Sequence, residues 1–100
     1  MIDIQPDHLE LIKNILDHHI PGIEVRAFGS RVSGQKKPYS DLDLVIVGQT
    51  QLPQKAYYQL KDAFEESSLP FRIDLLDWHR ISSSFGRVIE QAYQVIQKKA

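Results

Sequence analysis

The feature that most restricts the fold of this chain is a pair of aspartates, Asp41 and Asp43, at the head of the apolar run Leu44 to Val47. Successive side chains of a strand point to opposite faces, so residues two apart share a face. A strand that begins at Asp41 therefore directs both carboxylates to one face and turns Leu42 and Ile46 towards the other. Because the run after Asp43 is apolar at every position, we expect a central strand that is covered on both faces.

The residues before this strand add the elements of a phosphate site. Two neighbouring carboxylates repel each other and favour a cation between them, and Mg2+ commonly keeps substrate phosphates as further ligands. Gly29 leaves room for a phosphate, while Ser30 is expected to cap a short helix over residues 31–33. A plain strand-to-helix turn uses the same two residues, so the pair gains meaning only from the aspartates that follow. Arg31 is a further candidate for a phosphate contact.

This stretch resembles the signature of the minimal nucleotidyltransferases of the DNA polymerase beta superfamily. Their pattern is Gly-Ser, ten residues and Asp-x-Asp, and here Gly29-Ser30 is followed by ten residues and then Asp41-Leu42-Asp43. Gly34 and Ser40 also fit the longer form of the pattern. A match of several residue types at fixed spacing is far more specific than a lone glycine-rich loop.

Periodicity along the chain predicts the remaining elements. In order, we expect a helix from Pro6 to Pro21-Gly22, a strand from Ile23 to Phe28, the short helix, the strand from Asp41 to Val47, a helix from Gln54 to about Ser67, a strand from Phe71 to Leu76, and a long final helix from His79 or Arg80 to about Ile96. One hundred residues make one domain, 1–100. The expected fold is α/β (α+β), with a small three-stranded mixed sheet and helices packed against it. The order and direction of its strands follow from the resemblance.

Asp74 is the candidate for a third carboxylate. It is flanked by apolar residues on a predicted buried strand, where an unpaired carboxylate is costly. A salt bridge to Arg72 or Arg26 is one explanation. The other is a third metal ligand, which the resemblance favours because the superfamily carries its third carboxylate on the strand after Asp-x-Asp. Asp77 competes for this role, but its place at the strand's end beside Trp78 is more typical of a turn.

Composition excludes several classes of protein. The net charge of −1, with 12 Lys+Arg against 13 Asp+Glu, argues against direct binding to a nucleic-acid backbone. The absence of cysteine excludes disulfides, thiolate zinc sites and cysteine nucleophiles. No signal-peptide pattern or membrane-spanning run is visible, so we expect a cytoplasmic protein without a membrane partner. Lys36 and Lys37 lie in an expected loop, where lysines are more often solvated than bound to phosphate.

The resemblance implies transfer of a nucleoside monophosphate, AMP from ATP, to an acceptor hydroxyl. The implied site has Asp41, Asp43 and Asp74 as catalytic residues and ligands of two Mg2+ ions, and Gly29, Ser30 and Arg31 at the nucleotide. It also implies a small helical HEPN-type partner, a toxin whose tyrosine receives AMP, so that this chain acts as its antitoxin. We expect the partner to bind at the final helix or the Gln49–Tyr58 region. Two alternatives stay open: a small-molecule nucleotidyltransferase of the aminoglycoside-modifying kind, and a catalytically idle antitoxin that acts by contact alone.

Overall fold

The structure is a computed structural model that describes residues 2–34 and 41–100. Its elements are α1 (Pro6–His19), β1 (Glu24–Phe28), α2 (Ser30–Ser33), β2 (Leu42–Val47), α3 (Gln54–Glu65), β3 (Ile73–Asp77), a 3-10 turn (Trp78–Arg80), α4 (Ser83–Gln91) and β4 (Tyr93–Gln97). The strands form one sheet in the order β3-β2-β1-β4. β1 runs antiparallel to both β2 and β4, and β2 runs parallel to β3. The predicted class and mixed sheet are confirmed, with four strands instead of three.

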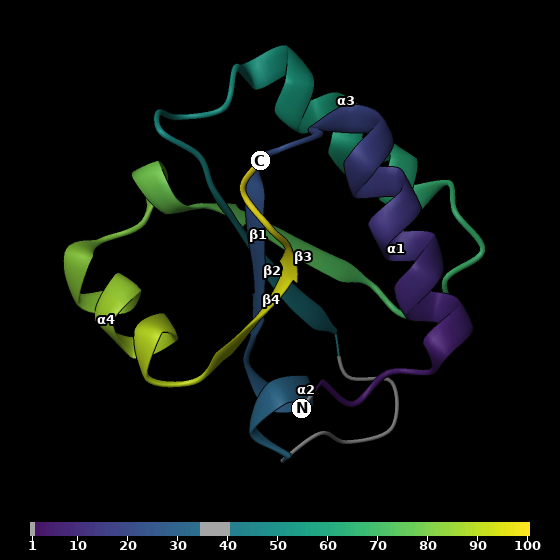
Figure 1. Ribbon diagram of the computed structural model, residues 1–100, viewed down its shortest axis with the longest axis horizontal. Coiled ribbons are helices and arrows are strands. Elements are labelled where there is room, and N and C mark those ends of the chain that lie inside the picture. The colour runs from purple at the N-terminus through teal and green to yellow at the C-terminus, as the bar shows by residue number, and fades with distance from the viewer. Residues whose placement is uncertain (1, 35–40) are drawn as a thin grey trace.

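The helices cover the two faces of the sheet unequally. Figure 1 shows α1 and α3 together on one side of the strands and α4 alone on the other. The larger core lies under α1 and α3, where the fully buried residues include Ile12, Leu16, Leu60, Leu42 and Leu44. This confirms the predicted alternation of β2, because its even-numbered residues enter this core. None of the described helices is long and apolar enough to cross a membrane.

The face under α4 carries a smaller apolar cluster. Phe28, Val45 and Ile89 are its buried members, and Trp78 and Ile81 pack against them from the chain before α4. α4 itself therefore inserts one fully buried side chain into this layer. Because apolar side chains cover only part of this face, polar side chains of β2 and β3 remain accessible on it.

The predicted long final helix is wrong in its second half. α4 ends at Gln91, Ala92 adopts extended backbone angles (φ −158°, ψ 100°), and β4 then pairs antiparallel with β1. The apolar residues of this segment fit a helical period and a strand period almost equally well over so few residues. Aromatic and β-branched residues favour strands, and β4 supplies hydrogen-bond partners to the outer edge of β1. Tertiary pairing therefore decided the outcome.

Asp77 has a structural position. Its side chain is 4% exposed on the α1 and α3 side of the sheet. One carboxylate oxygen accepts the backbone N–H of Leu52 at 2.8 Å, and the other accepts that of His79 at 2.9 Å. Asp77 thus fixes the connection between β2 and α3 and begins the 3-10 turn, as the turn interpretation predicted.

Replacing Asp77 by alanine should lower the free energy of unfolding. The change removes two hydrogen bonds to a charged group and leaves a buried N–H at Leu52 without its acceptor, which should cost about 3 kcal/mol. Urea unfolding measures the loss. Asp74→Ala is the matched control, because Asp74 is exposed on the same strand and should change stability little. Equal losses in both variants would contradict this role for Asp77.

Candidate active site

Three of the predicted carboxylates meet on the α4 face of the sheet. Asp43 on β2 lies directly opposite Asp74 on the parallel strand β3, so both side chains project from the same face. Asp41 stands two residues before Asp43, and its charge as well as that of Asp74 acts on the Asp43 carboxylate. The structure therefore brings Asp41, Asp43 and Asp74 together and places Asp77 on the opposite face. Their roles as metal ligands stay a prediction.

The carboxylates of Asp41, Asp43 and Asp74 repel one another. Burial, the charges of Asp74 and Asp41, and a hydrogen bond with Asp74 together raise the pKa of Asp43 from 3.8 to about 6, and burial makes the largest contribution. A carboxylate in such surroundings binds a proton more readily than usual, because its negative charge is poorly compensated. A divalent cation bound between the carboxylates would compensate their charge.

Gly29 forms the wall beside Asp43. It follows β1, whose last residue Phe28 pairs with Asp43, and it adopts φ 82° and ψ −157°. A Cβ atom at this position would lie 2.2 Å from Oδ2 of Asp43, a separation that real Cβ atoms essentially never show. Only glycine fits both the backbone angle and the approach of the carboxylate. The space that the sequence suggested for a phosphate is thus occupied by the Asp43 carboxylate, and glycine is required here for this steric reason.

The short helix α2 begins one residue earlier than expected. Gly29, not Ser30, is its N-cap, and no side chain caps it through a hydrogen bond. The Gly29 carbonyl accepts the N–H groups of Val32 and Ser33, each at 3.0 Å. Gly34 ends the helix with φ 84°. The prediction that Ser30 caps the helix is therefore wrong. Ser30 still lies in the first turn of α2, directly after Gly29.

Arg31 points into the protein. It is 6% exposed, its guanidinium donates to the Asp3 carbonyl at 3.0 Å, and it lies over the Phe71 ring at 4.3 Å. These contacts join α2 to the N-terminal segment and to the chain before β3. A phosphate contact from Arg31 remains a prediction, and Lys36 and Lys37 lie outside the described residues.

The donor set suits a hard divalent cation, although the described side chains are not arranged around one. Within residues 2–34 and 41–100, no three His, Cys, Asp or Glu side chains form a ready metal cluster. Carboxylate oxygens are nevertheless the ligands that Mg2+ prefers. Asp41 and Asp74 are exposed, so other side-chain rotamers are open to them without a change of fold.

Aromatic residues continue the carboxylate row towards the other edge of the sheet. Asp74, Asp43, Phe28 and Tyr93 stand side by side on the four strands. The Phe28 ring packs edge-to-face on Phe85 of α4 at 5.9 Å. Sequence reasoning missed Tyr93 because it placed this residue on a helix. The alternation of Tyr93 and Val95 was the available signal for a strand.

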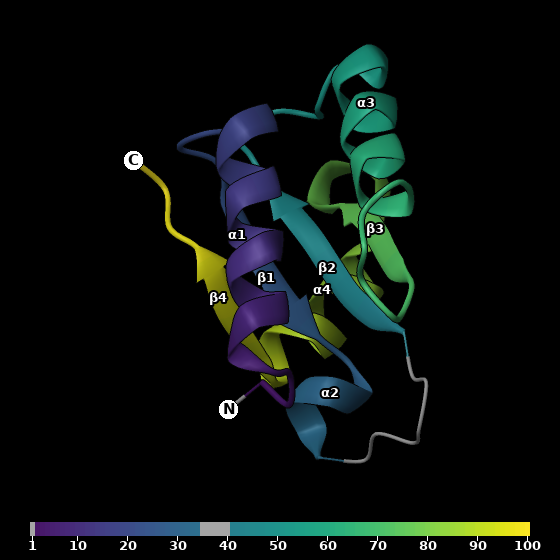
Figure 2. The same cartoon turned by 90° about the vertical axis from the view of Figure 1, so that its right-hand side faces the viewer.

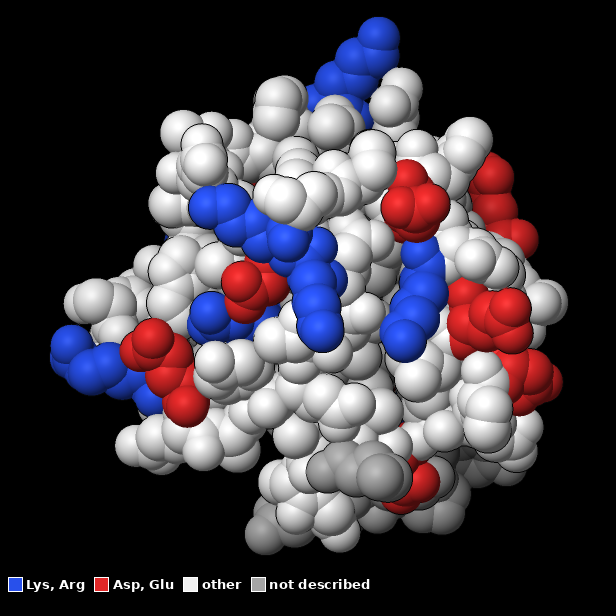
Figure 3. Space-filling model, in the orientation of Figure 1, with Lys and Arg blue, Asp and Glu red and all other residues white. Residues whose placement is uncertain are grey.

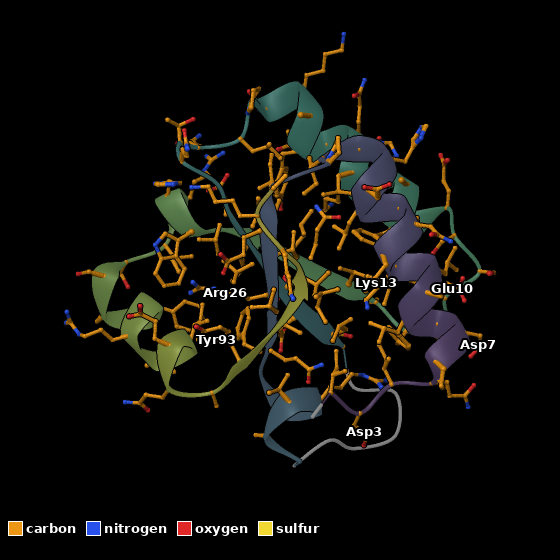
Figure 4. All side chains as sticks on the ribbon, in the orientation of Figure 1. Asp3, Asp7, Glu10, Lys13, Arg26 and Tyr93 are labelled. Atoms are coloured by element: carbon orange, nitrogen blue, oxygen red, sulfur yellow. The ribbon has the colours of Figure 1, made fainter. Side chains whose placement is uncertain are left out.

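Arg26 of β1, two residues before Phe28, contacts aromatic rings on both sides. Its guanidinium lies 5.4 Å from the Trp78 ring centre and 4.4 Å from that of Tyr93, and it pairs with Glu24 (Figure 4). The predicted alternative of a salt bridge from Asp74 to Arg26 has no counterpart among the described ion pairs. Arg26 thus secures β4 and the turn before α4, not the third carboxylate.

The charge of the surface fits the near-neutral composition. On the face drawn in Figure 3, basic and acidic side chains are interspersed, and the described residues there form no broad basic surface. A protein that binds nucleic acid through its phosphates normally presents such a surface.

The fold and the acidic site define the class of protein. The family described as "Polymerase beta, Nucleotidyltransferase" matches residues 10–100, so the chain belongs to this nucleotidyltransferase family. The "Probable protein adenylyltransferase MntA" of Haemophilus influenzae is 48% identical over 98 residues, which cover 98% of this chain and 86% of that protein.

Several solved structures with a similar fold are described as toxin–antitoxin complexes. One, described as a toxin-antitoxin with AMP-PNP, superposes with a TM-score of 0.75 at 22% identity, over 91% of this chain and 73% of that one. Another contains a tri-AMPylated Shewanella oneidensis HEPN toxin in complex with an MNT antitoxin, with a TM-score of 0.64 at 21% identity over the same shares of the two chains. At these identities the likeness shows the shared fold.

Gly29→Ala should displace the Asp43 carboxylate from its position against the backbone of residue 29. The added Cβ collides with Oδ2, and a positive φ strains any other residue. We expect loss of magnesium–ATP affinity together with a lower melting temperature. Gly34→Ala is the matched control, because Gly34 has a similar φ of 84° but nothing within 4 Å of an added Cβ. Calorimetry should find nucleotide affinity unchanged in the control; equal loss in both variants would contradict the steric argument.

Asp43→Asn should stabilise the metal-free protein at pH 7. The folded pKa of about 6 lies above the unfolded value of 3.8, so ionised Asp43 lowers stability above pH 6 and this loss disappears as pH falls towards 4. After allowance for solvent screening, we expect the melting temperature to rise by roughly 5 °C at pH 7. Scanning calorimetry from pH 7 to pH 4 should show the difference between variant and parent shrinking. A difference that grows towards low pH would have the wrong sign.

Proposed function

We propose that this chain is a protein adenylyltransferase that transfers AMP from ATP to a tyrosine hydroxyl of a HEPN-type partner and thereby acts as an antitoxin. The observation that carries the proposal is the meeting of Asp41, Asp43 and Asp74 on one face, with Gly29 against the Asp43 carboxylate. The 48% identity to a protein named as a probable protein adenylyltransferase supports the reaction class. The fold shared with the MNT antitoxin bound to an AMPylated HEPN toxin supports the kind of partner.

Each residue has a part in this reaction. Asp41 and Asp43 would hold two Mg2+ ions and Asp74 would bind one of them, and such ions neutralise phosphate charge and lower the pKa of an attacking hydroxyl. Gly29 lets the Asp43 carboxylate lie against the start of α2, because it carries no side chain there. Ser30 offers its hydroxyl and backbone N–H to the outer phosphates, and Arg31 would add a charge if its guanidinium turned outwards.

The reaction is an in-line displacement at the α-phosphorus. The bond between the acceptor oxygen and the α-phosphorus forms while the bond to the bridging oxygen of the β-phosphate breaks. Pyrophosphate leaves, and the hydroxyl proton passes to solvent. Positioning and charge neutralisation by the carboxylate site supply the acceleration.

The interspersed surface charge supports a protein acceptor over a nucleic-acid acceptor, since binding to a phosphate backbone depends on many Lys and Arg contacts. We expect the reaction in the cytoplasm, beside the partner. An antitoxin that acts by contact alone is the second candidate, because the described carboxylates are not arranged around a metal.

Labelled ATP tests the proposal. Incubation of the parent with Mg2+, labelled ATP and a HEPN-family toxin should move AMP onto that toxin, with a gain in mass of one or more AMP units. Replacing Asp41 and Asp43 by asparagine should abolish transfer and the metal dependence of nucleotide binding. A parent that binds its partner without modifying it, and a double variant that still neutralises it, would establish the contact-only antitoxin instead.

Asp74→Asn separates chemistry from binding in the same assay. Asp74 is assigned to the ion that serves the acceptor, so turnover should fall by about a hundredfold or more while nucleotide affinity changes little. Asp77→Asn is its control, because Asp77 lies on the other face and should affect stability first.

A further inference from the structure

The proposed site joins two parts of the chain that lie far apart in the sequence. Ser30, the first residue of α2, stands on one side of it, and Asp74 of β3 stands on the other. Figure 2 shows α2 at the lower end of β1, with the starts of β2 and β3 beside each other at the same end of the sheet. A nucleotide that contacts both parts depends on their separation, because misplacing a reacting group by about 1 Å can slow a reaction about a hundredfold.

α2 is too short to hold its own orientation. It spans four residues, and the Gly29 carbonyl accepts the N–H groups of Val32 and Ser33, each at 3.0 Å. A single helical turn is unfavourable unless tertiary contacts stabilise it. The position of Ser30 is therefore set by the contacts of α2 with the rest of the protein.

Arg31 supplies such a contact to the chain before β3. Its guanidinium lies 4.3 Å from the centre of the Phe71 ring, and the residue is 6% exposed. Phe71 comes three residues before Asp74. The next residue, Arg72, accepts the backbone N–H of Leu42 at 2.9 Å through its carbonyl, so this segment is also bound to the start of β2. Arg31 thus connects α2 with the segment that leads into the carboxylate strands.

The N-terminal segment holds Arg31 as well. The Asp3 carbonyl accepts from the Arg31 guanidinium at 3.0 Å, and the Asp3 N–H donates to the Arg31 carbonyl at 2.7 Å. Figure 4 shows Asp3 beside α2. The N–H of Ile2 donates to Oε1 of Gln94 on β4 at 2.6 Å, which ties the same segment to the sheet. Asp3 is therefore a fixed support for the guanidinium.

The chemistry of these contacts requires arginine. A planar guanidinium stacks on an aromatic ring and offers several N–H donors in a fixed geometry, whereas a lysine ammonium group is a compact and strongly hydrated charge. A phosphate contact makes no such demand, because lysine also binds phosphate as a point charge. The His8 ring of α1 packs edge-to-face on Phe71 at 5.9 Å, so the ring beneath Arg31 is itself held in place.

We propose that Arg31 is a positioning residue of the nucleotide site, which fixes α2 and with it Ser30 relative to the strand ends that carry the carboxylates. In this role the guanidinium keeps its inward place between Asp3 and Phe71 and does not turn outwards to a phosphate. This role rests on the nucleotide site of the function proposed above, and it concerns binding of magnesium–ATP whatever the acceptor is.

Calorimetric binding of magnesium–ATP to Arg31 and Phe71 variants tests this role without a partner protein. Arg31→Lys keeps the positive charge but loses the planar group, and Phe71→Leu removes the ring without changing any charge. Each should weaken magnesium–ATP affinity about tenfold or more. Phe71→Tyr keeps the ring and should bind as the parent does. Because both residues act through one contact, the double variant should lose no more than about either single variant.

Asp77→Ala is the stability control. Asp77 lies at the other end of β3 and supports the fold, so this variant shows how much affinity is lost through stability alone. It should keep the parental affinity at a temperature where thermal melting finds every variant folded. Hydrogen exchange at the N–H groups of Val32 and Ser33 adds a local measurement. Exchange there should quicken in Arg31→Lys and stay as in the parent in Asp77→Ala.

Three outcomes among the variants overturn the proposal. If Arg31→Lys binds magnesium–ATP as the parent does, the planar guanidinium does not set the site. If Arg31→Lys loses affinity while Phe71→Leu keeps it, Arg31 acts directly on the phosphates. If Asp77→Ala loses as much affinity as Arg31→Lys, the effect is one of stability alone.

The parent separates this role from the proposed function. A parent that binds magnesium–ATP but transfers no AMP to a HEPN-family toxin overturns the proposed function, while the affinities of the variants still decide the role of Arg31. A parent that binds no magnesium–ATP overturns both.

Discussion

The contact between Gly29 and Asp43 is the constraint on which the site depends. The Asp43 carboxylate occupies the space that any side chain at position 29 would need, with Oδ2 2.2 Å from the position of a Cβ atom. This close approach places the start of α2 against β2 and leaves the carboxylate beside the backbone turn. A glycine here therefore serves the shape of the site as well as the turn of the chain. The same contact positions Gly29 and the Asp43 carboxylate, the groups that the proposed function assigns to the nucleotide and the cation.

Burial of apolar side chains on one face of the sheet offsets the repulsion between the carboxylates on the other face. Burial and the neighbouring charges of Asp74 and Asp41 raise the pKa of Asp43, so its ionised form works against folding. On the reverse side of the same strands, Leu42, Leu44 and Leu75 pack under α1 and α3 in the main core. Alternation along β2 and β3 ties the two faces together, so burial of one set of side chains forces the other set into the site. The face under α1 and α3 therefore supplies stability, and the opposite face carries the carboxylates of the proposed site.

The two edges of the sheet have different chemistry. β4 closes the outer edge of β1, and Arg26 fixes it by lying between the Trp78 and Tyr93 rings. β3 leaves its outer edge to a groove, where the Tyr57 hydroxyl covers one carbonyl. An edge that is partly covered in this way resists pairing with strands of other proteins.

The sequence by itself determined the centre of the site and most of the core. Alternation after Asp41 predicted which residues of β2 enter the main core, and the family motif predicted that Gly29 and Asp43 belong to one site. The direct contact between these two residues comes from the structure. Asp74 was preferred to Asp77 with help from the family resemblance, and the structure places Asp74 opposite Asp43 while Asp77 bonds the backbone on the other face. Local patterns sufficed here because a strand's faces follow from its order of residues.

Only the tertiary structure decided the end of the chain and the surroundings of the carboxylates. Residues 93–97 carry a pattern that suits a helix or a strand, and β1, a segment some seventy positions earlier, selected the strand by offering an edge to pair with. The burial of Arg31 over Phe71 and the groove beside β3 likewise depend on contacts between distant segments. A sequence pattern records which side chains share a face, but it does not record which partner that face meets.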